Sequence, residues 1–396
     1  MIKIPYPGRF LEEAMSQFTR RQFAAGMMLG VAAPAVLRSA HAQGATIKIG
    51  QVVPITGPAA EAGKYAMAGA KIALETINKN GGILGKQVEI ITEDDQTTNP
   101  GAVLAFSKLA TNAEIVGFIA SIRSTQMHAM APDILKTAKP TMFGGTDPTL
   151  TKLGNPWLFR CRPNDTYSGK VIAEFGVKEL GLKKWGIVHS TDAFGTNGMK
   201  ALDESLKALG VTPVVIQGYA NQSQDFTPVV LALKQAGIDI LSSYFTFEGD
   251  LGIFARQLRQ LGVNAPWVGS PSIVNTSAIK LAGPALNDTY GVADYAEDSS
   301  PEAKAFANTY RGLMKVAPDN QSSWTFDAMN LLAAAINKAG KTDPNAVREA
   351  MLSIKKYKGA EGEYNFDANG DGLHGYNVVK NVKGNIEFAK HIEFPA

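Results

Sequence analysis

The chain has 396 residues, of which 45% are hydrophobic and 19% charged, with 39 glycines and 20 prolines. These values are typical of a folded globular protein of one large or two to three smaller domains, and they exclude a collagen or a coiled coil. A disulfide scaffold is excluded too, since Cys161 is the only cysteine. The formal net charge of +3 is a slight basic excess of the kind that draws proteins to anionic surfaces.

The first 42 residues have the pattern of an export signal. Arg20 and Arg21 precede an apolar run of about fifteen residues, too short for a bilayer, which needs roughly 20. Ala40-His41-Ala42 is a small-residue cleavage site. The paired arginines resemble a twin-arginine signal, with an ordinary secretory signal as the alternative. We therefore expect cleavage after Ala42 and a periplasmic mature chain.

The basic excess is confined to this segment. Residues 1–42 hold five basic and two acidic side chains, which leaves 34 of each kind in the remaining 354 residues. The mature chain is formally neutral, so the surplus belongs to the export signal and we expect no nucleic-acid partner.

From residue 46 onward, short apolar segments alternate with amphipathic ones. Near-continuous apolar runs predict strands, and apolar residues every three to four positions predict helices. One helix is marked by Met67, Ala70, Leu74 and Ile77 and should end at Asn80-Gly81-Gly82, where glycine can adopt the left-handed cap. The other elements expected before residue 145 are strands at 46–53, 88–94, 114–120 and 140–144 and helices at 100–111 and 125–137.

The same alternation resumes after residue 165. Expected strands are 184–190, 212–219, 238–245, 266–269 and 289–295, and expected helices are 166–180, 196–209, 226–236 and 249–261. The last hundred residues differ, with helices at 301–315, 322–339 and 344–355 and then strands near 363–366, 375–382 and 385–393. Two sets of alternating strands and helices predict two doubly wound α/β lobes, whose sheets place ligands at the carboxyl ends of their strands.

Signatures of catalysis are missing from the sequence. It has no phosphate loop, no dinucleotide-binding glycine motif, no His-Glu-x-x-His zinc motif and no Gly-x-Ser-x-Gly nucleophile elbow. Cys161, in a strand-like segment, is interpreted as a buried, unreactive thiol. Residues 367–372 match the first half of a calcium loop, but Val378 stands at the twelfth position, so a turn between strands is the simpler interpretation. We expect no catalytic residue, cofactor or metal.

Several ordered segments resemble the periplasmic binding proteins for branched-chain amino acids, the leucine-binding-protein-like receptors of ABC transporters. The similarity covers nearly all of the mature chain. It is carried by residues 46–85, 93–103 (EDDQTTNPGAV), 183–199 (KKWGIVHSTDAFGTNGM), 222–241, 324–336 (WTFDAMNLLAAAI) and 362–376 (GEYNFDANGDGLHGY).

This resemblance implies the type I periplasmic binding fold, in which a three-strand hinge joins two lobes. By likeness, the first lobe comprises residues 44–164 and 294–372, and the second comprises 165–293 and 373–396. The lobes should close around a ligand, and the closed form should dock on permease subunits at the inner membrane.

Two loops of the expected first lobe are candidates for ligand contact. Ser121, Arg123 and Ser124 lie directly before a helix, where hydroxyls and free backbone N–H groups can bind a carboxylate. The resemblance implies a ligand-binding serine in this loop without selecting one; the other interpretation is that these serines only cap the helix. Arg123 is either a charge partner for a carboxylate or a structural or exposed arginine. The loop Gly144-Gly145-Thr146 resembles the family loop that binds a carboxylate and an amine, with a plain turn as the alternative.

In the second lobe, Phe194 and Phe247 stand where family members carry aromatic lids, with core packing as the alternative. The sequence departs from the family after the strand at 266–269, where branched-chain receptors place a glutamate that pairs with the ligand ammonium. Here the chain has Gly269-Ser270-Pro271-Ser272. An unpaired buried ammonium is costly, so Glu248 or Asp192 would have to serve, or the ligand lacks an ammonium.

The expected function is that of a periplasmic solute-binding receptor that delivers an amino acid or a related small organic acid or amide to an ABC importer. An amide or urea-like compound or an aromatic or aliphatic carboxylate is the alternative ligand. A sensory ligand-binding protein that signals to a membrane receptor is the alternative function. A secreted enzyme is disfavoured by the missing acid/base and metal motifs.

Overall fold

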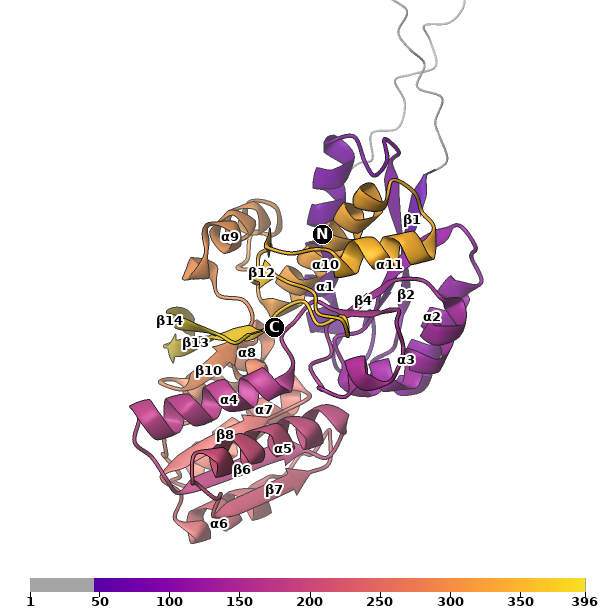
Figure 1. Cartoon of the computed structure of the whole chain (residues 1–396). Coiled ribbons are helices and arrows are strands. Elements are labelled where there is room, and N and C mark those ends of the chain that lie inside the picture. The colour runs from indigo at the N-terminus through magenta and orange to yellow at the C-terminus, as the bar shows by residue number, and fades with distance from the viewer. Residues whose placement is uncertain (1–45, 396) are drawn as a thin grey trace, which may run out of the picture. The chain divides into compact units, whose positions relative to one another are not determined.

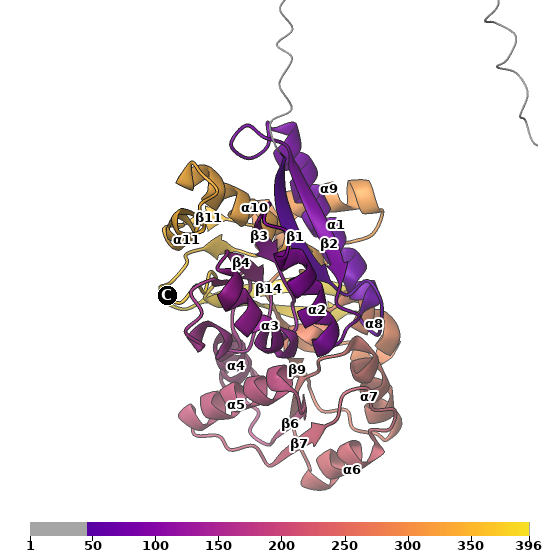
Figure 2. The same cartoon turned by 90° about the vertical axis from the view of Figure 1, so that its right-hand side faces the viewer.

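The computed structural model describes residues 46–395, so the predicted export signal and its cleavage site after Ala42 lie outside the described residues. The described strands sort into two lobes at opposite ends of Figures 1 and 2. Within this range, no helix is both long and hydrophobic enough to cross a bilayer.

The first lobe is built on a five-stranded parallel sheet. Its elements are β1 (Ile47–Val53), α1 (Ala60–Lys79), β2 (Val88–Asp94), α2 (Asn99–Ala110), β3 (Ile115–Ile119), α3 (Ser124–Thr137), β4 (Thr141–Phe143), η1 (Leu150–Lys152), β5 (Leu158–Arg160), α9 (Pro301–Met314), α10 (Asn320–Ala339), α11 (Pro344–Leu352), β11 (Tyr357–Lys358) and β12 (Glu363–Tyr364). The strand order is β2-β1-β3-β4-β5. Helices α1, α10 and α11 share one core with Ile47 and Ile49, and α2 and α3 share another with Phe118. The sheet is thus covered on both faces, as its near-continuous apolar strands require.

The second lobe combines a parallel sheet with a mixed one. Its elements are α4 (Asp165–Glu174), the π-helical turn η2 (Phe175–Glu179), β6 (Trp185–Ser190), α5 (Ala193–Ala208), β7 (Val215–Tyr219), α6 (Thr227–Ala236), β8 (Ile240–Tyr244), α7 (Glu248–Gln260), β9 (Val268–Gly269), η3 (Pro271–Val274), α8 (Thr276–Ala282), η4 (Gly283–Leu286), β10 (Tyr290–Ala293), β13 (Gly375–Val382) and β14 (Asn385–Glu393). The orders are β7-β6-β8 and β14-β13-β10-β9, and a parallel bridge from Leu241 to Trp267 connects the two sheets. The carboxyl-terminal strands β13 and β14 therefore complete the second lobe.

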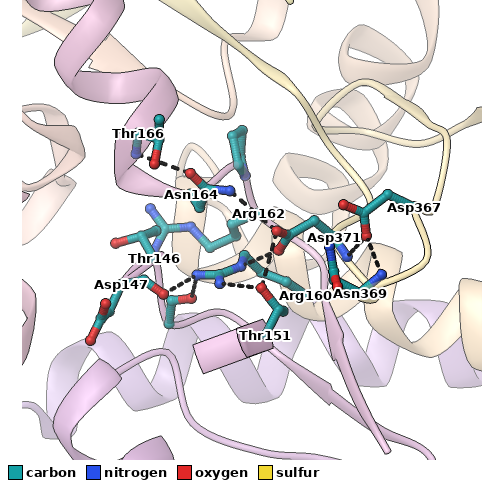
Figure 3. Close-up of polar contacts among 12 residues, drawn as sticks. Thr146, Asp147, Thr151, Arg160, Arg162, Asn164, Thr166, Asp367, Asn369 and Asp371 are labelled. Carbon is teal, nitrogen blue, oxygen red and sulfur yellow. Dashed lines mark hydrogen bonds and ion pairs between the residues drawn. The ribbon is translucent and has the colours of Figure 1, made fainter. Parts of the chain in front are cut away.

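Three segments connect the lobes and are joined to one another by buried polar contacts. Residues 161–164 follow β5, residues 294–300 follow β10, and residues 365–374 precede β13. Arg162 pairs with Asp294, and Asn164 Nδ2 donates to Asp371 Oδ2 at 3.2 Å (Figure 3). These contacts bring all three segments together, while the expected lobe boundaries near residues 164, 293 and 372 stay predictions.

The start of α10 is held in place by its cap and by a close crossing with α1. The Asp319 side chain accepts from the backbone N–H groups of Gln321 and Ser322, and the Ser322 hydroxyl accepts from Asp319 N–H, which is a reciprocal capping box. A Cβ added to Gly69 of α1 would lie 1.9 Å from the Ser322 carbonyl oxygen, so only glycine permits this approach. The first turn of α10 therefore has a defined position above the first sheet.

The predicted α/β alternation is confirmed, with small differences at the ends of elements. The segment predicted as one helix at 166–180 is an α-helix to Glu174 followed by a π-helical turn. Helix α8 and the two-residue strand β11 were not predicted. The predicted burial of Cys161 is confirmed, and burial raises the pKa of its thiol well above the ordinary value, which keeps it protonated and unreactive.

Candidate functional site

A cavity of about 70 Å³ lies between the two lobes. The segments around it follow β3, β4, β6, β8 and β9, so it sits at the carboxyl ends of parallel strands, where open α/β sheets bind ligands. One further wall comes from the first turn of α10. The lining residues are Ile122, Arg123, Ser124, Thr125, Thr146, Arg162, Asp192, Phe194, Phe245, Thr246, Glu248, Pro271, Ser272, Asn275, Asn320 and Gln321.

Five of the nine residues predicted to touch ligand line this cavity and four do not. Arg123, Ser124, Thr146, Phe194 and Glu248 are brought together there. The residues outside the lining are Ser121, Gly144, Gly145 and Phe247.

Each of these four has another contact. The Ser121 hydroxyl is turned inward, where it donates to Gln126 and accepts from Arg123 N–H at 2.9 Å. The Gly144 carbonyl accepts from Arg162 and the Gly145 carbonyl from Arg160. Phe247 is buried, and its ring lies against the guanidinium of Arg123. These positions support the cavity from outside instead of facing it.

Arg123 reaches across the cavity from the first lobe to the second. Its Nη1 donates to the Thr246 carbonyl at 2.9 Å, and its guanidinium carbon lies 4.6 Å from the centre of the Phe247 ring. Its Nε is buried without a hydrogen-bond partner, and no carboxylate within residues 46–395 forms an ion pair with it. Arg123 is thus a cation at the cavity whose charge no direct acidic partner neutralises.

Thr146 is engaged with a buried acid. Its hydroxyl donates to Asp165 Oδ2 at 2.8 Å, and the Ser168 hydroxyl donates to Asp165 Oδ1 at 3.0 Å. Burial raises the pKa of Asp165 to about 6 although these hydrogen bonds lower it. The Thr146 hydroxyl therefore stabilises the loop in addition to facing the cavity.

We expect the Thr146→Val variant to lower the free energy of unfolding by about 1–3 kcal/mol, because buried Asp165 would lose a hydrogen-bond donor while side-chain volume is nearly conserved. Urea denaturation at pH 7 measures this. Thr146→Ser, which keeps the hydroxyl, is the matched control. Equal stability of the Val and Ser variants would show that the hydroxyl gives Asp165 no net support.

The two acids of the second lobe that face the cavity differ in how fully they are engaged. Asp192 accepts from the Gly195 N–H at 2.9 Å, as the N-cap of α5, and from the side chains of Ser190, Asn221 and Thr246. Glu248, at the first position of α7, accepts a hydrogen bond from Asn275 Nδ2 at 3.3 Å and from no other residue between 46 and 395. A carboxylate has about four acceptor positions, so Glu248 keeps most of its hydrogen-bonding capacity and Asp192 does not.

Four lining residues lie outside every loop considered from the sequence for ligand contact: Arg162, Asn275, Asn320 and Gln321. Arg162 lies in the first connecting segment and Asn275 caps α8, a helix that was not predicted. Asn320 and Gln321 open α10, whose predicted start at residue 322 was two residues late. The Asp319-x-x-Ser322 pattern was a visible signal for the true start.

Several carboxyl groups are buried close to this region. Burial raises the pKa of Asp319 to about 7; hydrogen bonds from the Ser322 and Gln321 N–H groups lower it, and the negative charge of Glu248 raises it again. Burial also raises the pKa of Glu361 well above its ordinary value. Both carboxyl groups therefore bind a proton more tightly than a free carboxyl group does, which reduces their negative charge at neutral pH.

The loop with a partial calcium-binding pattern is tied into the connecting segments (Figure 3). Asp367 Oδ1 accepts from the backbone N–H groups of Asn369 and Asp371 at 2.8 and 2.9 Å, as in a turn. The Asp371 carboxylate accepts from Arg160, and also from Thr151 and Asn164. Residues 46–395 contain no cluster of three or more acidic, histidine or cysteine side chains suited to a metal ion.

Comparison with known proteins places these features in context. Residues 46–385 match the family model described as periplasmic binding protein. The leucine-, isoleucine-, valine-, threonine- and alanine-binding protein of Pseudomonas aeruginosa is 28% identical over 331 residues, covering 82% of this chain and 87% of that protein.

Two solved structures resemble the fold. The branched-chain amino acid transporter substrate-binding protein LivJ of Streptococcus pneumoniae, in complex with isoleucine, superimposes with a TM-score of 0.82 at 23% identity, covering 88% of this chain and all of that one. A solute-binding protein of an ABC transporter from R. palustris, in complex with benzoate, gives 0.79 at 20% identity, covering 88% and 96%. At these identities the likeness concerns the fold.

Proposed function

This chain belongs to the periplasmic binding protein family, and on that premise we propose that it captures an amino acid or a related small organic acid or amide and delivers it to an ABC importer. Its fold is the type I periplasmic binding fold, and its relatives are binding proteins of transporters, not enzymes. The observation that carries the proposal is the polar cavity between two lobes in a chain that matches the family over nearly its whole described length.

The charges around the cavity support a ligand with an acidic end. Arg123 forms no ion pair within the described residues, and the N-terminus of α3, with Ser124 and Thr125 facing the cavity, adds N–H groups and a positive dipole end. A ligand carboxylate in this position would be held by Arg123 and by the first turn of α3. On the opposite lobe, Glu248 is available for a ligand ammonium in place of the absent family glutamate.

Capture would work through a shift between open and closed arrangements of the lobes. A ligand that touches Arg123 on one lobe and Glu248 on the other binds the closed form better, and this difference in affinity drives closure. Docking of the closed form on permease subunits at the inner membrane belongs to the same proposal. So do export through a twin-arginine signal and cleavage after Ala42.

A nitrogen-free carboxylate is the second candidate ligand. It is favoured by the guanidinium of Arg123, which forms no ion pair in the described chain, and by the aromatic ring of Phe194 at the cavity, and benzoate is a suitable probe. The sensory alternative has the same site, and the presence of permease and ATPase genes beside this one distinguishes transport from sensing.

A thermal-shift panel tests the proposal on the purified protein with the twenty standard amino acids, acetamide, urea and benzoate. A compound present at 100 times its dissociation constant should add about 2.7 kcal/mol to the free energy of unfolding, since it binds only the folded state. The proposal expects at least one compound to do so and to be recovered unchanged. Turnover of the bound compound would contradict a receptor.

A further inference from the structure

The cavity wall formed by α10 contains two amide side chains that bind nothing in the protein. Asn320 and Gln321 line the cavity and are 7% and 6% exposed. Neither side chain forms a hydrogen bond to another residue within 46–395, and Asn320 Oδ1 is fully buried. An amide withdrawn from water without a partner is costly, and native proteins seldom keep one except where it serves a function.

The two amides belong to the first turn of α10, which is capped and well packed. Asn320 and Gln321 are the first residues of the twenty-residue helix α10, and the capping box of Asp319 and Ser322 fixes that end. The Thr325 hydroxyl donates to the Ala66 carbonyl of α1 at 2.7 Å, and this hydrogen bond attaches the start of α10 to α1. The amides are therefore presented to the cavity by a well-packed helix, as a recognition site requires.

The two amides have carboxyl oxygens with unused acceptor capacity near them. Glu248 enters the cavity from the other lobe with most of its acceptor positions unused. Asp319 precedes Asn320 in the chain, and its Oδ2 is buried without a partner in the described residues. Free acceptor oxygens favour a group that donates hydrogen bonds, and the Glu248 carboxylate favours one that also carries positive charge.

Resting on the proposed function, we propose that Asn320 and Gln321 of α10, together with Glu248 of α7, form a subsite for the nitrogen end of the ligand, an ammonium or an amide NH₂. The acid end of the same ligand lies at Arg123 and the first turn of α3. The substrate class is then a small compound that carries both a carboxylate or carbonyl oxygen and a nitrogen donor. The nitrogen-free carboxylate considered above is disfavoured.

This subsite also explains how a ligand would promote closure. The Glu248 carboxylate belongs to the second lobe and Asn320 to the first. A nitrogen donor held between Glu248 and Asn320 contacts both lobes at once and so binds the closed form better than the open form. A ligand without a nitrogen donor lacks these contacts.

The test is isothermal titration calorimetry of the purified protein with matched pairs of probes that differ only in the nitrogen group. The pairs are L-leucine and 4-methylpentanoate, L-phenylalanine and 3-phenylpropanoate, L-alanine and propanoate, and acetamide and acetate. The subsite predicts that the tightest probe carries nitrogen and that its nitrogen-free partner binds at least about 100-fold more weakly, because buried acceptors would lose their donor.

Substitutions of single residues test whether Asn320 and Glu248 contact the nitrogen group of the ligand. Asn320→Ala should weaken the tightest nitrogen-bearing probe by about tenfold or more, whereas Asn330→Ala, the same substitution farther along α10, should stay within about twofold of the unmodified protein. Since the Asn320 side chain bonds to no other residue of the described chain, its removal should not unfold the protein. Glu248→Gln should weaken an ammonium probe more than a neutral amide probe.

The outcomes separate this subsite from the general function. Equal binding of a nitrogen-free acid and its nitrogen-bearing partner, or an unchanged affinity in Asn320→Ala, would overturn the subsite and leave the receptor function standing. If no probe binds and native mass spectrometry of the purified protein finds no bound solute, both fail.

Discussion

Replacing Arg162 with methionine is expected to lower the free energy of unfolding by about 3–5 kcal/mol, because the substitution leaves a buried carboxylate without its partner. The Arg162 and Asp294 side chains are 6% and 0% exposed, and they pair through Arg162 Nε. The other oxygen of Asp294 has no hydrogen-bond partner. Burial disfavours the charged form of Arg162, but the nearby Asp294 carboxylate raises its pKa above the ordinary value.

The position of this pair makes the effect large. Arg162 lies in the first connecting segment and Asp294 begins the second, and Arg162 Nη1 also donates to the Gly144 carbonyl at 3.1 Å. Urea denaturation of the ligand-free protein measures the loss, with exposed Arg256→Met as the matched control. The double variant Arg162→Met with Asp294→Leu should recover part of it, because no charge is then stranded. If Arg162→Met is as stable as the control Arg256→Met, the prediction is refuted.

The second large effect is the dependence of the free energy of unfolding on pH, to which buried Asp319 contributes. The unfolded chain releases this proton near pH 3.8, whereas the folded protein holds it to about pH 7. Between these values the folded state binds more protons, so the free energy of unfolding falls as pH rises. A pKa raised from 3.8 to about 7 corresponds to roughly 4 kcal/mol.

Asp319→Asn should therefore flatten the dependence of stability on pH. Asparagine caps a helix as well as aspartate does, so the start of α10 is preserved. The stability of the variant relative to the unmodified protein should increase by up to roughly 4 kcal/mol from pH 4 to pH 8. Urea denaturation across this range measures the difference, with Asp298→Asn, an exposed position, as the control. A difference that stays constant with pH would refute the buried-carboxyl explanation.

Local sequence patterns predicted most of the elements because strand and helix periodicities are carried by neighbouring residues. They failed where the pattern is short. Helix α8 has seven residues and buries only two small side chains, Ala278 and Ala282, so it has no recognisable apolar face. The turn at 175–179 continues a helical pattern, and no local pattern distinguishes its π geometry from an α-helix; Phe175 of this turn packs in the same buried cluster as Trp185.

Part of the candidate site was predictable because it follows strands that the local sequence pattern identifies. Arg123, Ser124 and Thr146 follow strands of one parallel sheet, and the carboxyl ends of such strands share an edge. Asn320 was missed because its place at the cavity depends on how α10 crosses α1 at Gly69, a contact between residues about 250 positions apart in the chain.

The sequence by itself determined the alternation of strands and helices, the family resemblance and the confinement of the excess positive charge to residues 1–42. Only the tertiary structure decided which charges are neutralised. Arg162 and Arg123 are both arginines at the cavity, yet Arg162 forms an ion pair with Asp294 of a distant segment and Arg123 forms none within residues 46–395. Periodicity is a local property, whereas the pairing of charges depends on distances set by the three connecting segments, and the slight basic excess therefore gave no information about the ligand.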